Sequence, residues 1–404
     1  MSVWALGAVL GEGVEQAGSI ACIAFALVLW PRLQLDRPAR RFAFAALALA
    51  LWQTVSPALA LCQGVAHRWP KSGRYGQILD TLAPAALGAL TTVAVPWAAL
   101  LLVLAIGWTL STALGAYQHF VRWPFAQPWF LKTPVARVQE AFSVGGPPRY
   151  GSGGLLFHRL RFAHGAVALL GLSLTRIFSS RTTRLRAAAA ILTAFLLADI
   201  YFSFARAALL AAVFLLALSF LLLGRGWQRL GVLAGAALLV LAALSPAWRL
   251  RMVKAEQNIL EERHLSMQVG LRLVRAHPFL GVGFGNHQEA AWATQAETGV
   301  TPLLSIDSHD LWLTSWVETG LIGLLLTLAY HLLLGRALWQ RFRAGSWAGA
   351  AGLISFAGFH LLSLVHYLQH HTGVYLTFSL VWGLALSPPA PGTSSAESPA
   401  RGDW

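Results

Sequence analysis

Charged residues are scarce in this sequence. Only 11% of the 404 residues are Asp, Glu, Lys or Arg, against about 25% in a typical soluble domain. Apolar residues make up 56% of the chain. A water-soluble enzyme of this length needs far more polar surface, and a disordered chain has far fewer apolar residues. The composition excludes both classes and indicates a polytopic membrane protein.

Cysteine, internal repeats and a signal peptide are also missing or nearly so. The two cysteines, Cys22 and Cys62, both lie within apolar stretches, which indicates neither a disulfide framework nor a thiolate metal site. The absence of a repeat disfavours a transporter built from inverted repeats. No basic segment precedes the first apolar run, so we expect that run to remain in the protein.

Apolar segments account for most of the chain. We predict an all-α fold with about 11–12 transmembrane helices, which form a single domain over residues 1–388. A short helix over 2–12 would supply the twelfth span, and the sequence leaves the N-terminal topology open. The eleven candidate spans lie near 14–31, 41–63, 81–97, 98–116, 164–179, 187–204, 206–223, 230–247, 309–334, 348–366 and 372–388.

Basic residues outnumber acidic ones by 30 to 16, which gives a formal charge of +14. Such a balance can indicate nucleic-acid binding, but the arginines gather in short loops between the spans, as they do on the cytoplasmic side of membrane proteins. The number of spans between successive loops is even, as it must be if all of these loops are cytoplasmic. The Pro- and Ser-rich tail at 389–404 is then expected to be cytoplasmic and disordered. We therefore expect membrane lipid, and no nucleic acid, as a partner. The short basic loops are 32–41, 181–186, 225–229 and 336–343.

Three longer loops then fall on the non-cytoplasmic side, at about 64–80, 117–163 and 248–308. Each carries basic residues, against the usual trend. Either these charges are simply solvated, or they serve an anionic ligand. Within the last loop, residues 256–276 have helical spacing, which predicts a helix near the membrane surface. Its expected apolar face comprises Leu260, Met267, Leu271 and Val274.

Several polar residues could carry chemistry. Arg206 lies between two apolar runs and is either a fixed cation at the outer mouth of the bundle or a side chain that reaches the lipid headgroups. Asp199 would share a face with Arg206, and could pair with it, if one helix continued through both. His309 is expected at the outer end of a span, and histidine suits proton transfer near neutral pH. A second histidine group, in the last outer turn, is either polar surface facing an acceptor or a metal site; it comprises His366, His370 and His371.

Three short motifs occur together after the long outer loop. They read His277-Pro-Phe-Leu-Gly-Val-Gly-Phe-Gly-Asn286, Ser308-His-Asp-Leu-Trp-Leu313 and Glu318-Thr-Gly-Leu-Ile-Gly323. Taken alone, the alternating glycines of the first motif indicate a tight turn after a helix rather than a nucleotide site. Together the motifs, over about 263–323, resemble the signature region of the O-antigen ligase family. Its superfamily also includes O-antigen polymerases and protein O-oligosaccharyltransferases.

The resemblance carries over to individual residues. Arg206 matches the arginine of a Ser-Arg-Gly pattern, although its neighbours here are alanines. Arg263 is the best match to the family's second arginine, in the loop helix. His309 matches the family's histidine, which is more commonly followed by Asn than by Asp310. The resemblance also implies a multi-pass protein of the bacterial inner membrane whose active site faces the periplasm.

The resemblance implies transfer of a glycan from undecaprenyl diphosphate to lipid A–core. Arginine suits a diphosphate because guanidinium pairs bidentately with phosphate and stays charged, and the candidates are Arg206 and Arg263, with Arg272 and Arg275 as helpers. His309 would act as general base, or position the acceptor hydroxyl, and direct attack would invert the anomeric centre.

We expect no cofactor. Asp307 and Asp310 flank His309 and leave a metal site open, but arginines can supply the charge that a divalent ion would provide, so we predict a metal-independent enzyme. Asp310 and Asp199 are candidates for a supporting role. Glu318 lies nine positions after His309 and would point to the opposite face of a continuous helix, which favours a packing or gating role.

Three other functions remain open. An O-antigen polymerase would use a second lipid-linked glycan as the acceptor, and a protein O-oligosaccharyltransferase would use a protein. A lipid or glycan transporter would bind an anionic substrate with the same arginines but would form no bond. The long asymmetric outer loop and the lack of repeats disfavour the transporter.

Overall fold

The structure is a computed structural model of the chain. It describes residues 12–29, 35–66, 69–70, 73–92, 97–122, 141–142, 147–156, 158–224, 228–254, 256–294 and 307–387. The predicted tail at 389–404 lies outside the described residues, as does the short helix expected over 2–12, except for its last residue.

Helices make up nearly all of the described chain, which confirms the all-α prediction. Between helices α5 and α7 the structure has a two-residue antiparallel strand pair, β1 (Ala141–Phe142) and β2 (Arg149–Tyr150), and the 3-10 turn η2 (Gly154–Leu156). A second 3-10 turn is η4 (Leu368–His370). The α-helices are α2 (Glu12–Val28), α3 (Arg37–Cys62), α4 (Gly73–Leu90), α5 (Trp97–Phe120), α7 (Arg159–Ser179), α8 (Thr183–Ser203), α9 (Arg206–Leu223), α10 (Gln228–Ala243), α11 (Pro246–Lys254), α12 (Glu256–Ala276), α13 (His287–Ala293), α15 (Leu311–Arg343), α16 (Trp347–Ser363) and α17 (Thr372–Leu386).

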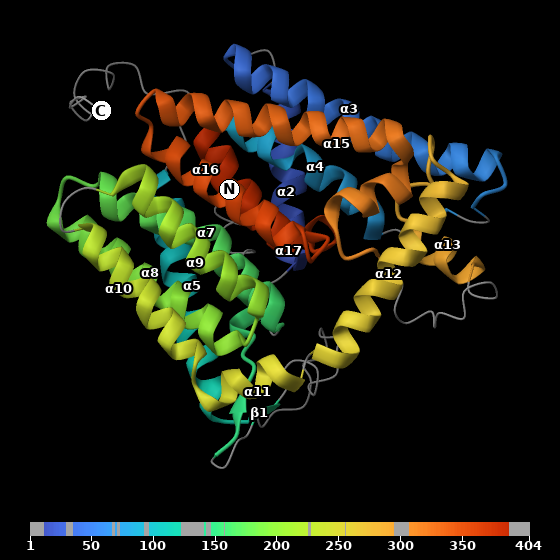
Figure 1. Ribbon diagram of the computed structural model, residues 1–404. Coiled ribbons are helices and arrows are strands. Elements are labelled where there is room, and N and C mark those ends of the chain that lie inside the picture. Colours follow the sequence, from blue (N-terminus) through green and yellow to red (C-terminus); the bar gives the residue numbers. More distant parts are fainter. Residues whose placement is uncertain are drawn as a thin grey trace.

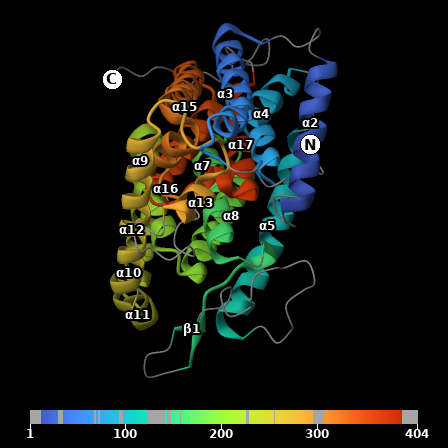
Figure 2. The ribbon, with the colours of Figure 1, turned by 90° about the vertical axis from the view of Figure 1, so that its right-hand side faces the viewer.

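The helices run roughly alongside one another, with β1 and α11 at one end of the bundle (Figure 2). Every predicted span overlaps one of these helices in the described part of the chain. Among the described residues, five helices are long and apolar enough to cross a membrane, namely α3, α7, α8, α9 and α15, and shorter apolar helices lie at Ala17–Val28, α16 and α17. The chain is therefore a polytopic membrane protein.

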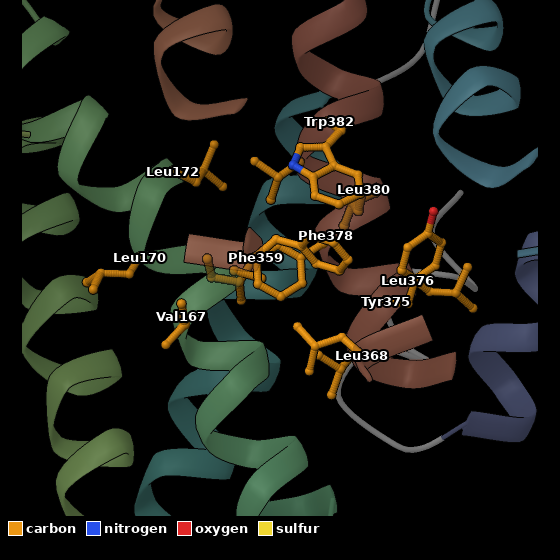
Figure 3. Packing of buried hydrophobic residues seen from close by; sticks show 14 of the residues in the cluster. Val167, Leu170, Leu172, Phe359, Leu368, Tyr375, Leu376, Phe378, Leu380 and Trp382 are labelled. Atoms are coloured by element: carbon orange, nitrogen blue, oxygen red, sulfur yellow. The ribbon is translucent and has the colours of Figure 1, made fainter. Parts of the chain in front are cut away.

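Helix α7 is the centre of the bundle. It packs against α8, α9, α16 and α17, and every residue from 162 to 175 is buried. At Gly171 an added Cβ would lie 2.8 Å from the backbone nitrogen of Ser355, so only glycine allows α7 and α16 to approach this closely. On α16 and α17, aromatic rings fill the adjoining core, where Phe359 and Trp382 meet edge to face at 5.1 Å between centroids (Figure 3).

Helix α15 is folded back on itself. Gly320 has φ 66° and ψ −171°, a non-helical conformation that essentially only glycine adopts. The rings of Trp312 and His331 are 5.6 Å apart between centroids, whereas a straight helix would separate these residues by about 28 Å. Residues 311–319 (the short arm) therefore lie against residues 321–343 (the long arm). The continuous helix that we assumed from His309 to Glu318 is wrong, because His309 has a left-handed backbone and lies before Asp310, the N-cap of the short arm.

The glycine-rich segment after α12 packs against the point where α15 folds back. The backbone nitrogen of Val282 donates to the carbonyl of Val317 at 2.9 Å, and that of Leu321 donates to the carbonyl of Pro278 at 2.9 Å. A Cβ on Gly281, which has φ 69°, would lie 2.5 Å from the nitrogen of Gly320. The tight turn predicted from the glycines is confirmed, and the two glycine motifs form one structural unit.

Candidate active site

A fixed turn precedes the short arm and carries His309. The Asp307 carboxylate oxygen Oδ1 accepts a hydrogen bond from the backbone nitrogen of His309 at 2.7 Å. The backbone nitrogen of Ser308 donates to Thr314 Oγ1 at 3.2 Å, and Ser308 Oγ lies 2.9 Å from His287 Nε2 of α13. Because these bonds reach α13 and the short arm, the turn is held on both sides.

His309 is the partly exposed side chain of this turn. Its backbone is left-handed, with φ 54°, which is uncommon for residues other than glycine. Its side chain is 40% exposed, against 10% for Asp307, and Nδ1 of the imidazole lies 3.3 Å from Oδ1 of that carboxylate. The fold of α15 places His309 beside the middle of the long arm, so the expected position at the outer end of a span is wrong. The imidazole is recessed beside the bundle.

Asp310 begins the short arm as its N-cap. Its Oδ1 accepts a hydrogen bond from the backbone nitrogen of Leu313 at 2.7 Å, and burial raises the pKa of its carboxyl above the ordinary value. Asn and Asp cap helices about equally well. The cap explains how Asp can replace the more common Asn here, and it gives Asp310 a structural role.

Arg206 is the first residue of α9. Helix α8 ends at Ser203, and Phe204 closes it with a left-handed backbone of φ 54°, so no continuous helix joins Asp199 to Arg206. Asp199 is instead buried, and its Oδ2 accepts a hydrogen bond from Thr112 of α5 at 3.0 Å. The suggested Asp199–Arg206 pair is wrong, because the break redirects the arginine.

Arg263 of α12 is brought to Arg206. Burial, followed by the charge of Arg206, lowers the pKa of the Arg263 guanidinium. Within the part of the chain that the structure describes, neither guanidinium has a hydrogen bond or an ion pair. Two cations that repel one another and lack a carboxylate partner form a site that an anion would stabilise.

A comparison with protein families shows what this region of the chain is similar to. Residues 188–328 match the family model described as O-antigen ligase. Over these residues the chain is similar to the O-antigen ligase family. No curated protein matches its sequence. The family comprises glycosyltransferase-like ligases and polymerases that act on lipid-linked glycans in a membrane.

The matched region includes α12. Figure 1 shows this helix running from α11 to α13, beside the folded end of α15. The predicted helix over 256–276 is confirmed. Its buried face is formed by Val269, Leu273 and Val274, whereas Met267 and Leu271 are exposed. Two of the four residues predicted for the apolar face therefore point away from the protein.

Arg272 and Arg275 also lie on α12, and both are exposed. Arg272 follows Arg263 by nine residues, which places them about 180° apart around the helix. Buried Gly270 lies on the side of α12 that packs against Ser308 and Leu313. The structure thus brings Arg263, but not Arg272, to the site.

His366 is a residue whose proximity to the site the sequence did not reveal. It lies in the turn between α16 and α17, and burial lowers the pKa of its imidazole well below the ordinary value, with smaller contributions from His164, Arg263, His371 and His309. It therefore lies close enough to Arg263 and His309 to feel their charges. Among the described residues, no group of three or more His, Cys, Asp or Glu could hold a metal ion. The side chain of His370 lies outside the described part.

Glu318 is fully buried near the end of the short arm. Burial raises the pKa of Tyr367, in the turn after α16, and the charge of Glu318 adds to this shift. Trp52 of α3 donates from Nε1 to the carbonyl of Thr319 at 2.9 Å. Glu318 therefore lies near α3 and near the turn between α16 and α17. Its packing or gating role remains a prediction.

Proposed function

We propose that this chain is an O-antigen ligase that transfers O-antigen glycan from undecaprenyl diphosphate to lipid A–core, with inversion and without a metal. The observation that carries the proposal is the Arg206–Arg263 pair, which has no carboxylate partner among the described residues and lies near His366, itself close to His309. The family match supports a member of the ligase and polymerase superfamily, and the choice of ligase within it is our proposal.

In the proposed reaction, the acceptor hydroxyl oxygen attacks the anomeric carbon of the donor sugar. The bond between that carbon and the phosphate oxygen breaks, and its electron pair leaves with the diphosphate. Arg206 and Arg263 stabilise this charge, which is most effective in a site that excludes water. His309 accepts the proton of the acceptor hydroxyl at Nε2. Back-side attack by the acceptor gives inversion.

The proposed location is the bacterial inner membrane, with the site facing the periplasm. Both substrates are lipid-anchored, so a site recessed beside the bundle is reached from the membrane surface. Arg272 and Arg275, exposed on α12, would contact the donor only at the rim of this site, and Asp199 would support it only through the packing of α5 and α8.

The test is transfer in vitro with purified protein, lipid-linked O-glycan, lipid A–core and EDTA. We expect glycan on lipid A–core in the wild type and its loss in Arg206→Ala, Arg263→Ala and His309→Ala, each checked for correct folding by size-exclusion chromatography. Near wild-type transfer in all three variants would contradict the proposal.

Other products of the same assay identify the alternatives. Longer glycans on the lipid carrier, with none on lipid A–core, would show a polymerase. Transfer to a protein acceptor would show a protein O-oligosaccharyltransferase. If no acceptor is glycosylated but vesicles containing the protein take up the lipid-linked glycan, the chain is a transporter. Transfer that appears only when a divalent ion replaces EDTA would contradict metal independence alone.

A further inference from the structure

We propose that Asp307 is a positioning residue for His309, whose carboxylate holds the imidazole in one orientation and stabilises it when it takes a proton. The proposal rests on the proposed function, since it needs His309 to act as the general base. It concerns a residue that the sequence indicates only as a flanking carboxylate.

One oxygen atom holds His309 at two points. Asp307 Oδ1 accepts from the backbone nitrogen of His309 at 2.7 Å and lies 3.3 Å from Nδ1 of its imidazole. The first contact fixes the left-handed backbone at φ 54°, a conformation that needs support from its surroundings. The second contact limits rotation of the ring. A single carboxylate therefore controls both where the imidazole starts and which way it points.

The contact at Nδ1 also selects the tautomer. A carboxylate next to Nδ1 favours a proton on that nitrogen, which leaves Nε2 with a free lone pair. The Asp307 side chain is 10% exposed, whereas that of His309 is 40% exposed. Nε2, which keeps its lone pair, therefore belongs to the more exposed of the two side chains. In the reaction the acceptor O–H bond breaks, its proton moves to Nε2, and the resulting imidazolium stays beside the Asp307 carboxylate.

Other charged groups around His309 act differently. Asp310 is in the same turn, but its Oδ1 caps the short arm at Leu313. His366 approaches from the turn after α16, and Arg263 of α12 lies near His366. His366 is neutral and Arg263 is a cation, so neither supplies a negative charge to an imidazolium. Among the described groups around His309, Asp307 is the carboxylate that contacts the imidazole.

The test compares Asp307→Asn with Asp310→Asn in the purified full-length protein. Each variant removes one negative charge from the same turn, and each Asn keeps an oxygen for the existing backbone hydrogen bond. We expect kcat for glycan transfer to fall about 100-fold in Asp307→Asn, with the donor KM within about twofold of the wild type. The acidic limb of its kcat–pH profile should move to lower pH, because the protonated imidazole has lost its carboxylate. Asp310→Asn should retain wild-type kcat and pH profile.

The variant Asp307→Glu covers the case in which Asp307→Asn does not fold. Glutamate keeps the charge, so we expect kcat between those of the wild type and Asp307→Asn, with the acidic limb near its wild-type position. If Asp307→Asn matches Asp310→Asn in kcat and pH profile, or if a folded Asp307→Glu shifts the acidic limb as far as Asn does, the inference is wrong.

His309→Ala separates this inference from the proposed function. Loss of transfer in His309→Ala together with full activity in Asp307→Asn would overturn the positioning role alone. Retained transfer in His309→Ala would overturn the proposed catalytic site itself, whatever Asp307→Asn does.

Discussion

At the scale of single residues, the site depends on two arginines that have no carboxylate partner among the described residues. Arg206 and Arg263 lie close enough for one charge to lower the pKa of the other guanidinium, and no described carboxylate pairs with either. Such an arrangement costs free energy in the empty protein. In the proposed reaction the diphosphate of the donor would remove this cost when it binds between the two guanidinium groups.

Replacing either arginine with lysine tests this interpretation. Lysine keeps the positive charge but loses the planar fork that pairs with two phosphate oxygens. We expect kcat/KM to fall about 10- to 100-fold in Arg206→Lys and in Arg263→Lys, measured by transfer to lipid A–core. Arg272→Lys, on the opposite side of α12, is the matched control and should change kcat/KM less than about threefold. Equal losses in all three variants would show that general basic charge, not this pair, binds the donor.

At the scale of elements, the fold of α15 decides where His309 lies. Gly320 can turn the chain only because it has no Cβ, and the space where a Cβ would be is filled by the backbone of Phe279 and Leu280. The short arm is then fixed by Trp316, whose Nε1 donates to the carbonyl of Pro278 at 3.0 Å. The glycine-rich segment thus supports the short arm and the turn that carries His309.

Gly320→Ala should therefore damage both stability and transfer. Its φ of 66° with ψ of −171° is strained for alanine, and the added Cβ meets backbone atoms that cannot move aside. We expect a loss of about 3 kcal/mol or more in the free energy of unfolding, seen as a lower melting temperature in detergent, with transfer activity lost. Gly235→Ala in α10 is the control, because nothing lies within 4 Å of its added Cβ. A Gly320→Ala protein as stable and active as Gly235→Ala would show that the fold-back is not needed.

The elements also show how far sequence reasoning extends. Apolar runs predicted the helices well, because a helix that crosses a bilayer needs about 20 apolar residues whatever the topology. Hydrophobic spacing cannot report a single glycine with positive φ, so the reversal at Gly320 and the recessed position of His309 were missed. The closeness of Arg206, Arg263 and His366 depends on tertiary packing, and only the resemblance to the ligase family linked the first two.

At the scale of the whole molecule, the two ends of the bundle differ in chemistry. At one end Arg341 pairs with Asp36 at 2.7 Å and donates to the carbonyl of Leu386 at 3.0 Å, which ties together the ends of α3, α15 and α17. Asp36 and Arg341 belong to loops that we predict to be cytoplasmic, and Leu386 lies near the end of the last predicted span. The other end of α3, at Cys62, would then be periplasmic, on the side from which the lipid-linked substrates approach the site.

The two native cysteines allow this orientation to be tested. Cys62 is exposed, whereas Cys22 is buried. We expect a membrane-impermeant maleimide to label the wild type in intact spheroplasts, and Cys62→Ser to abolish this labelling. As the control, Arg184→Cys in the Cys62→Ser background places an exposed thiol at the start of α8, in a loop that we predict to be cytoplasmic, and should be labelled only after permeabilisation. The reverse pattern would place the end of α3 at Cys62 in the cytoplasm, away from lipid A–core, and a periplasmic ligase could not then have this topology.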